Sequence, residues 1–314
     1  MLRNAIRKTE TRRIGLLLAA VTAVISGFAV FINGYGVRAW SEISDPTTYT
    51  TLKNMVAAAV LVTVATLVTR AKSSESVTLP HGAAQWSGLA AVAVVGGSIA
   101  FVLFFEGLAR ASSGQAAFIH KTLLIWVAIL AVGILRERIG FPHVAAVVLL
   151  VWGQAVLIGG LGDLGFGTGE WMMLAATLLW SVEIIIAKRL LASVSSLTVG
   201  VARMAGGALL LITYGFARGA FANLSGVTVQ HAAWILATGL VLAAFVGTWY
   251  AALARAQAVD VTAVLVAGAL ITAVLRLGVQ GTALPSAAGL GLVAAGVALA
   301  ATAGWRRPVL TQSQ

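Results

Sequence analysis

Ten long apolar stretches dominate this chain, and they constrain its fold more than any other feature. A helix needs about 20 mostly apolar residues to cross a bilayer. Only 10% of the 314 residues are charged, whereas soluble domains carry roughly 25%. The sequence therefore predicts an all-α integral membrane protein with ten transmembrane helices, at residues 14–34, 48–69, 86–107, 114–135, 142–160, 170–187, 199–217, 232–254, 262–283 and 286–304.

The basic residues predict the orientation of these spans. If the N-terminus is cytoplasmic, 14 of the 21 Lys and Arg residues fall on the cytoplasmic side and four on the other side. Cytoplasmic loops of membrane proteins carry such an excess of basic residues. We therefore expect a multi-pass protein of the cell membrane with both termini in the cytoplasm. In a bacterium, this is the inner membrane. The net charge of +11 is explained by these loops, so no nucleic-acid partner is expected.

Weak internal similarity indicates that the chain contains two related halves. The segment Leu-Ala-Arg-Ala occurs at 108–111 and again at 253–256, at the ends of the third and eighth spans. Thr22 and Ser26 of the first span also align with Thr177 and Ser181 of the sixth. Five spans per half invert the second half relative to the first, an arrangement found in many secondary transporters. We expect a first repeat at 1–160 and a second, inverted repeat at 161–314.

Two segments carry a resemblance to a known family. Residues 114–122, Gly-Gln-Ala-Ala-Phe-Ile-His-Lys-Thr, lead into Leu-Arg-Glu-Arg-Ile at 135–139, and Asp45-Pro46 precedes Lys53 at the second span. With ten spans in two halves, this chain resembles the EamA-type transporters of the drug/metabolite transporter superfamily. The second half departs from the family pattern, because Gln280-Gly281 stands where an acidic-basic pair is often repeated. The resemblance implies export or exchange of small metabolites, such as amino acids or amphipathic compounds.

Glu183 is the most unusual residue, because it lies about 20 Å along the sixth span at 1.5 Å per residue. Ionisable groups inside a span are rare and usually face a cavity or a partner. Glu183 is either a proton-coupling or substrate-binding carboxylate, or one member of a structural ion pair. The sequence offers three basic partners for such a pair, namely Lys188, Arg276 and Lys121.

Other polar and aromatic residues inside the spans are further candidates. Lys121 is a candidate to bind a substrate carboxylate, with His120 in a proton relay, although snorkelling of Lys121 to the interface is the alternative. Arg276 either binds an anionic group or pairs with Glu183 or Glu106. Trp180 lies deep enough to line a pocket. The candidate substrate-binding or coupling residues are therefore Glu183, His120, Lys121, Arg276, Trp180, Ser26 and Ser181.

These observations predict a secondary active transporter that moves a small metabolite by alternating access, with export favoured by the family resemblance. A proton is the candidate coupling ion, and the other expected partners are the substrate and the lipid bilayer. A channel for small solutes is the first alternative, but the spans offer no obvious continuous polar lining. A membrane-embedded enzyme is the second, and the sequence holds no Walker loop, no metal-binding pair of histidines and no nucleophile elbow. No catalytic residue, metal or cofactor is expected.

Overall fold

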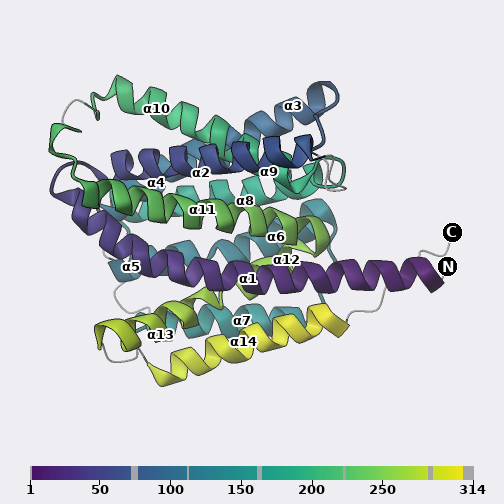
Figure 1. Ribbon diagram of the computed structural model, residues 1–314. Helices are drawn as coiled ribbons and strands as arrows, with labels where there is room; N and C mark the ends of the chain where they lie inside the picture. The colour runs from purple at the N-terminus through teal and green to yellow at the C-terminus, as the bar shows by residue number, and fades with distance from the viewer. Residues whose placement is uncertain are drawn as a thin grey trace.

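The computed structural model describes residues 2–71, 77–111, 113–160, 165–221, 224–281 and 286–306 (Figure 1). Lys72 and Arg307, two of the basic residues counted for the orientation, lie outside these ranges. Every element within them is a helix. In chain order the helices are α1 (Leu2–Ser41), α2 (Pro46–Arg70), α3 (Gly82–Ala91), η1 (Val92–Ile99), α4 (Ala100–Leu108), α5 (Ser113–Lys121), α6 (Leu123–Leu135), α7 (Phe141–Leu157), α8 (Thr168–Leu190), α9 (Ser196–Val201), η2 (Ala202–Gly206), α10 (Gly207–Ala217), η3 (Leu224–Gly226), α11 (Val229–Arg255), α12 (Ala258–Leu265), α13 (Gly268–Gln280) and α14 (Ala287–Arg306).

The predicted spans coincide closely with these helices. Among the described residues, nine helical stretches, counted across short internal breaks, are long and apolar enough to cross a membrane. The remaining prediction, 142–160, corresponds to α7, which is apolar but only 17 residues long. At 1.5 Å per residue α7 measures about 25 Å, slightly less than the thickness of a typical hydrocarbon core. The structure therefore supports an all-α membrane protein with nine such helices and a shorter apolar one.

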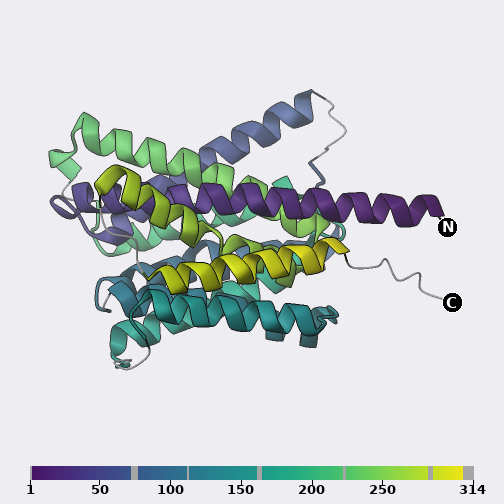
Figure 2. The ribbon, with the colours of Figure 1, turned by 90° about the horizontal axis from the view of Figure 1, so that it is seen from below.

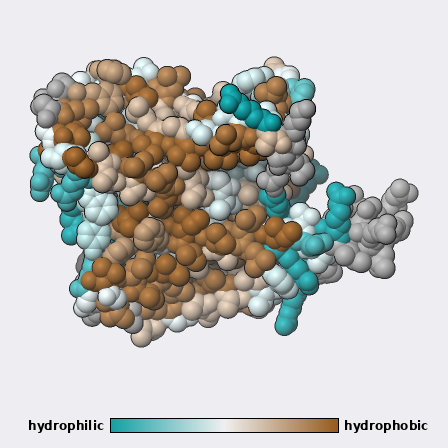
Figure 3. Space-filling model, viewed as in Figure 1, coloured by the Kyte–Doolittle hydropathy of each residue, from teal (hydrophilic) through white to brown (hydrophobic). Residues whose placement is uncertain are grey.

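The surface also fits a bilayer. In the space-filling view a broad apolar band separates polar side chains at the two ends of the bundle (Figure 3). The start of α1 and the end of α14 lie at the same end, where the Arg13 guanidinium stacks 4.9 Å from the centre of the Trp305 ring. We call this the basic end, and the other the opposite end. The arginines near the basic end are Arg12 and Arg13, inside the first part of α1, and Arg70, Arg136, Arg189, Arg255 and Arg306 at or next to helix ends.

Helices that are distant in sequence pack side by side. Helix α1 lies against α11, α12 and α13, and α4 lies against α8. Helix α7 runs alongside α14, which Figure 2 shows from below. Each of these contacts joins a helix from residues 1–160 to a helix from residues 161–314. The interior of the bundle is therefore built jointly by the two parts of the chain.

In the described part of the chain, four spans depart from one regular α-helix near the middle of the bundle. The span at 114–135 was expected to be one helix, but α5 and α6 are separated at Thr122, whose hydroxyl donates to the Ile119 carbonyl at 2.6 Å. A similar break at Val266 and Ala267 separates α12 from α13. The π-helical segments η1 and η2 pack against each other. At their contact, any side chain at position 97 would collide with the Arg203 carbonyl, so only glycine fits there. Such departures from regular α-helix are often found at functional sites.

Candidate functional site

A lysine is buried inside the bundle with an amide oxygen rather than an acid as its partner. Lys53 lies in the third turn of α2 and is only 7% exposed. Its ammonium group donates to Asn33 Oδ1 at 3.0 Å. It also lies over two aromatic faces, 5.4 Å from the ring centre of Tyr49 and 5.3 Å from that of Phe105. A buried cation without a carboxylate partner is costly.

Five ring-bearing side chains surround the interior next to Lys53. We call Phe101, Phe104, Phe105, His120 and Trp180 the aromatic cluster. Phe101 stacks on Phe105 with ring centres 6.4 Å apart, and the edge of Trp180 meets Phe101 at 5.4 Å. His120 completes the cluster from α5, 5.2 Å from Trp180. Offset and edge-to-face ring contacts of this kind hold aromatic side chains in fixed positions.

Glu183 meets its partners at the inner side of the aromatic cluster. Its carboxylate is 2% exposed and accepts a hydrogen bond from the Tyr250 hydroxyl at 2.5 Å. Arg203 Nε lies 3.8 Å from Glu183 Oε2. The same guanidinium lies over the Phe101 ring at 5.4 Å. Glycine at position 96 leaves the space that the Glu183 side chain occupies, because a Cβ atom there would overlap it.

These groups form one continuous interior surface. Lys53 touches Phe105, Phe105 stacks on Phe101, and Phe101 contacts both Trp180 and Arg203. The contributing elements are α2, α4, α5, α8, η2 and α11, so both parts of the chain build it. The surface combines aromatic faces, a buried cation and a buried ion pair. Ligand sites have this composition, being mostly apolar with a few convergent polar groups.

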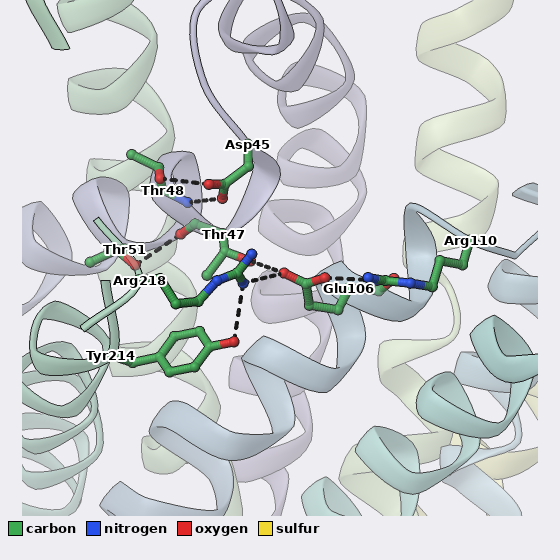
Figure 4. Close-up of polar contacts among 8 residues, drawn as sticks. All are labelled: Asp45, Thr47, Thr48, Thr51, Glu106, Arg110, Tyr214 and Arg218. Carbon is green, nitrogen blue, oxygen red and sulfur yellow. Dashed lines mark hydrogen bonds and ion pairs between the residues drawn. The ribbon is translucent and has the colours of Figure 1, made fainter. Parts of the chain in front are cut away.

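An open cavity of about 350 Å³ leads from the opposite end toward this interior. Phe105 forms part of its wall, and the Lys53 ammonium group lies 5.3 Å from the centre of the same ring. At the mouth, Glu106 binds Arg110 and Arg218, each at 2.7 Å, and accepts from Thr47 at 3.2 Å (Figure 4). Glu106 belongs to α4 and Arg218 follows α10, so this pair also joins the two parts of the chain. The Glu106 hydrogen bond holds the pKa of Arg218 above its ordinary value, so the arginine is charged.

Some of the predicted site residues lie in the interior described above, and the others lie away from it. His120 and Trp180 are in ring contact in the interior, and Glu183 is buried three residues after Trp180 on α8. Lys121 is the half-buried neighbour of His120. Ser181 is fully buried but donates to the Thr177 carbonyl of its own helix. Ser26 lies at the close contact of α1 with α13, opposite Gly268. Arg276 is exposed on α13.

The expected partners of Glu183 and Arg276 were wrong. Glu183 pairs with Arg203 instead of Lys188, Arg276 or Lys121. Lys188 turns away because its ammonium group donates to the Leu253 and Ala256 carbonyls, at 2.5 and 2.6 Å. Glu106, the other partner considered for Arg276, is held by Arg110 and Arg218.

Sequence reasoning also missed several residues of the interior. Tyr250, Asn33, Arg203 and Lys53 were not among the candidate site residues. One signal was available: Lys53 and Arg203 each lie near the start of a span, 150 residues apart. Asp260 and His143 were missed as well, and they form a second buried polar contact at 3.1 Å, near the basic end.

Comparison with known proteins supports the family resemblance. No curated protein matches the sequence. A solved structure titled "Crystal structure of protein" is similar over 93% of this chain and 95% of its own, with a TM-score of 0.69 and 19% identity. At that identity the likeness concerns the fold alone. Residues 13–159 match the model of the EamA-like transporter family. This match assigns residues 13–159, slightly less than half of the chain, to the EamA-like transporters of the drug/metabolite transporter superfamily.

Proposed function

We propose that this protein is a secondary active transporter that moves a small amino acid-like or amphipathic metabolite by alternating access. The single observation that carries the proposal is the interior surface of Lys53, the aromatic cluster and the Glu183–Arg203 pair. It lies between helices of both parts of the chain, as the sites of secondary transporters do. Export is the proposed direction, and it rests on the family resemblance.

Corresponding features in the two parts of the chain support an inverted repeat and, with it, this mechanism. The helix breaks at Thr122 and Ala267 are 145 residues apart, like the two Leu-Ala-Arg-Ala segments. Arg136 and Gly281, which end α6 and α13 in the left-handed conformation, are 145 residues apart too. Transporters with inverted repeats often place broken helices at corresponding positions of both halves, beside the substrate. We therefore propose repeats at residues 1–160 and 161–314.

The chemistry of the interior suggests how a substrate binds. Lys53 is the group that receives a carboxylate or another anionic group, because Asn33 alone leaves its charge uncompensated. The apolar body of the substrate lies on Phe101, Phe105 and Trp180, whose faces can also hold an aromatic ring. Glu183, neutralised by Arg203, is available for a substrate ammonium group when that pair opens.

A ligand-stabilisation screen of the purified protein tests this assignment. The screen compares aromatic and aliphatic amino acids, aromatic carboxylates, nucleobases and lipophilic cations. A ligand at 100 times its Kd stabilises the folded state by about 2.7 kcal/mol. Compounds that combine a carboxylate with an apolar body are expected to raise the melting temperature. Stabilisation by lipophilic cations alone would contradict a site centred on Lys53.

Both termini are proposed to lie in the cytoplasm. The observation behind this is the gathering of arginines at the end where α1 begins and α14 ends. A reporter fused after residue 314 should be active on the cytoplasmic side, and one inserted between α7 and α8, in the 161–169 segment, on the other side. Residues 161–164 of that segment lie outside the described residues. The same side for both reporters would rule out this topology.

A further inference from the structure

The open cavity at the opposite end has two arginines in its wall, and neither has been given a role in binding. Arg110 follows α4 and Arg218 follows α10, so the two parts of the chain contribute one arginine each. Their side chains are 50% and 43% exposed, so solvent reaches both of them. The wall therefore presents two accessible cations outside the interior surface described above.

Glu106 holds both guanidinium groups at the cavity wall (Figure 4). Its Oε2 atom accepts from Arg110 Nη1 and its Oε1 atom accepts from Arg218 Nη1, each at 2.7 Å. Oε1 also accepts from the Thr47 hydroxyl at 3.2 Å. Both carboxylate oxygens are thus occupied, and one negative charge is shared between two positive ones.

Both guanidinium groups keep N–H donors for a further partner. In the described part of the chain, Arg110 bonds through Nη1 alone, to Glu106 Oε2 and to the Glu106 backbone carbonyl at 2.6 Å. Arg218 also bonds through Nη1 alone, to Glu106 Oε1 and to the Tyr214 hydroxyl at 3.1 Å. The N–H groups on Nε and Nη2 of each arginine remain for another acceptor. Paired N–H groups of this kind match the two oxygens of a carboxylate.

Asp45 is the other acid among the described residues that line the cavity, and its carboxylate caps the start of α2. Its Oδ1 atom accepts from the Thr48 backbone N–H at 2.8 Å, and its Oδ2 atom accepts from the Thr48 hydroxyl at 3.2 Å. The positive end of the α2 dipole opposes the charge of this capping carboxylate. Asp45 therefore offsets the charge of the arginines only in part, and the wall retains positive charge.

Apolar groups complete the wall next to the arginines. Phe105, Pro46 and Ala109 all line the cavity. Its volume of about 350 Å³ lies at the lower end of the range of about 300–1,000 Å³ that small-molecule sites occupy. An apolar wall beside two guanidinium groups fits a small compound that combines an anionic group with an apolar body.

We propose that this cavity is a second, outer binding site for a small carboxylate with an apolar body, such as an aromatic acid. The carboxylate accepts from the remaining N–H groups of Arg110 and Arg218, and Glu106 positions both arginines. The apolar body lies against Phe105 and Ala109. The headgroup of an anionic lipid offers similar oxygens, so it is the competing occupant.

The position of the cavity suggests its part in transport. Phe105 belongs to both sites, since it lines the cavity and its ring centre lies 5.3 Å from the Lys53 ammonium group. On the proposed function, a carboxylate that leaves Lys53 toward the opposite end meets Arg110 and Arg218 next, and the outer site holds exported substrate before release. This role rests on the proposed transport function, whereas binding in the cavity does not.

Labelling of a single introduced cysteine tests the site in the full-length protein. The chain has no cysteine, so Ala109→Cys places the only thiol at an exposed position of the cavity wall. The probe is benzoate, and the readout is the rate at which a water-soluble maleimide labels the thiol in lipid nanodiscs of phosphatidylcholine. Benzoate should slow the labelling in a saturable way, and benzyl alcohol, its neutral analogue, should not.

Two further substitutions, each added to Ala109→Cys, assign the protection to the arginines. Arg110→Met and Arg218→Met should each raise the benzoate concentration for half-maximal protection about fivefold or more, the effect of losing one half-exposed ion pair. Arg38→Met is the matched control and should leave that concentration unchanged. Arg38 is exposed at the same end, but its guanidinium donates to the Gly34 carbonyl at 3.0 Å and does not line the cavity.

Lys53→Met separates the outer site from the interior one, and it should keep the protection. The proposal is overturned if benzoate does not slow the labelling, if benzyl alcohol protects equally well, or if Lys53→Met abolishes the protection. Protection that is unchanged in Arg218→Met, or in Arg110→Met where Arg218→Met fails to fold, overturns it as well.

The nanodisc composition distinguishes a dissolved carboxylate from a lipid. Phosphatidylglycerol that blocks the labelling and leaves benzoate without effect would assign the cavity to a lipid headgroup and overturn the proposal. The labelling assay contains no transport step, so its outcome is independent of substrate exchange. Benzoate protection in a protein that exchanges no substrate would establish the outer site and overturn its place on the transport path.

Discussion

Replacing Glu183 with glutamine is expected to lower the free energy of unfolding by about 3–5 kcal/mol, because the change leaves a buried charge unpaired. Arg203 is only 9% exposed, and Glu183 is the acid beside its guanidinium, at 3.8 Å. The variant also loses the charged acceptor of the Tyr250 hydroxyl. Thermal unfolding of the purified variant, compared with wild type in the same detergent, measures the effect.

A second change tests the cause of that loss. Glu183→Gln combined with Arg203→Met removes both charges, so most of the lost stability should return, as expected for groups that interact directly. Glu170→Gln is the control on the same helix. Glu170 accepts from the Gly167 N–H at the start of α8, and glutamine can keep this bond. A Glu183→Gln variant as stable as wild type would contradict the ion pair.

The second large effect is expected at Lys53, where stability and binding should change in opposite directions. Lys53→Met removes a buried charge and keeps the apolar stem, so the free energy of unfolding should rise by about 1 kcal/mol or more. In this variant Asn33 Oδ1 still accepts a hydrogen bond from the Tyr49 hydroxyl, at 3.2 Å. Binding of an anionic substrate should weaken about 30-fold or more, because removing one partner of a buried charge pair costs about 2–5 kcal/mol.

Lys53→Arg provides the matched control, since it keeps the positive charge at the same position. Titration of the stabilising compound from the ligand screen against all three proteins measures the affinities. The arginine variant should retain much of the binding that methionine abolishes. Equal affinity in wild type and Lys53→Met would show that the anionic group binds elsewhere.

The sequence predicted where the apolar helices lie, because long apolar runs leave a membrane chain few other structures. It did not predict the length of α1, which runs from Leu2 to Ser41 instead of over 14–34. It could not predict the interruptions. Residues 114–135 are apolar enough for one helix, and the break at Thr122 depends on a local hydrogen bond to Ile119. Nor could apolar patterning reveal the π-helical segments, whose position reflects the close contact of Gly97 with the backbone around Arg203.

The sequence identified only those site residues whose depth within a span marked them as unusual. Glu183 and Trp180 were selected because they lie deep within a span, and both are buried. Their partners were not predicted, since Arg203, Tyr250 and Phe101 come from other helices and the contacts depend on the packing of those helices. Asp260 was missed for a simpler reason: the ninth span was expected to begin at residue 262, whereas α12 begins at Ala258 and places Asp260 inside it.

Substrate exchange by the reconstituted protein tests the central claim most directly. Proteoliposomes are loaded with the most strongly stabilising compound from the screen, and uptake of the same compound in labelled form is then followed. Alternating access through one interior site predicts uptake that saturates with concentration, is accelerated by compound inside the vesicles and is lost in Lys53→Met. Uptake that rises linearly with concentration and ignores the internal compound would contradict the transporter and favour a channel.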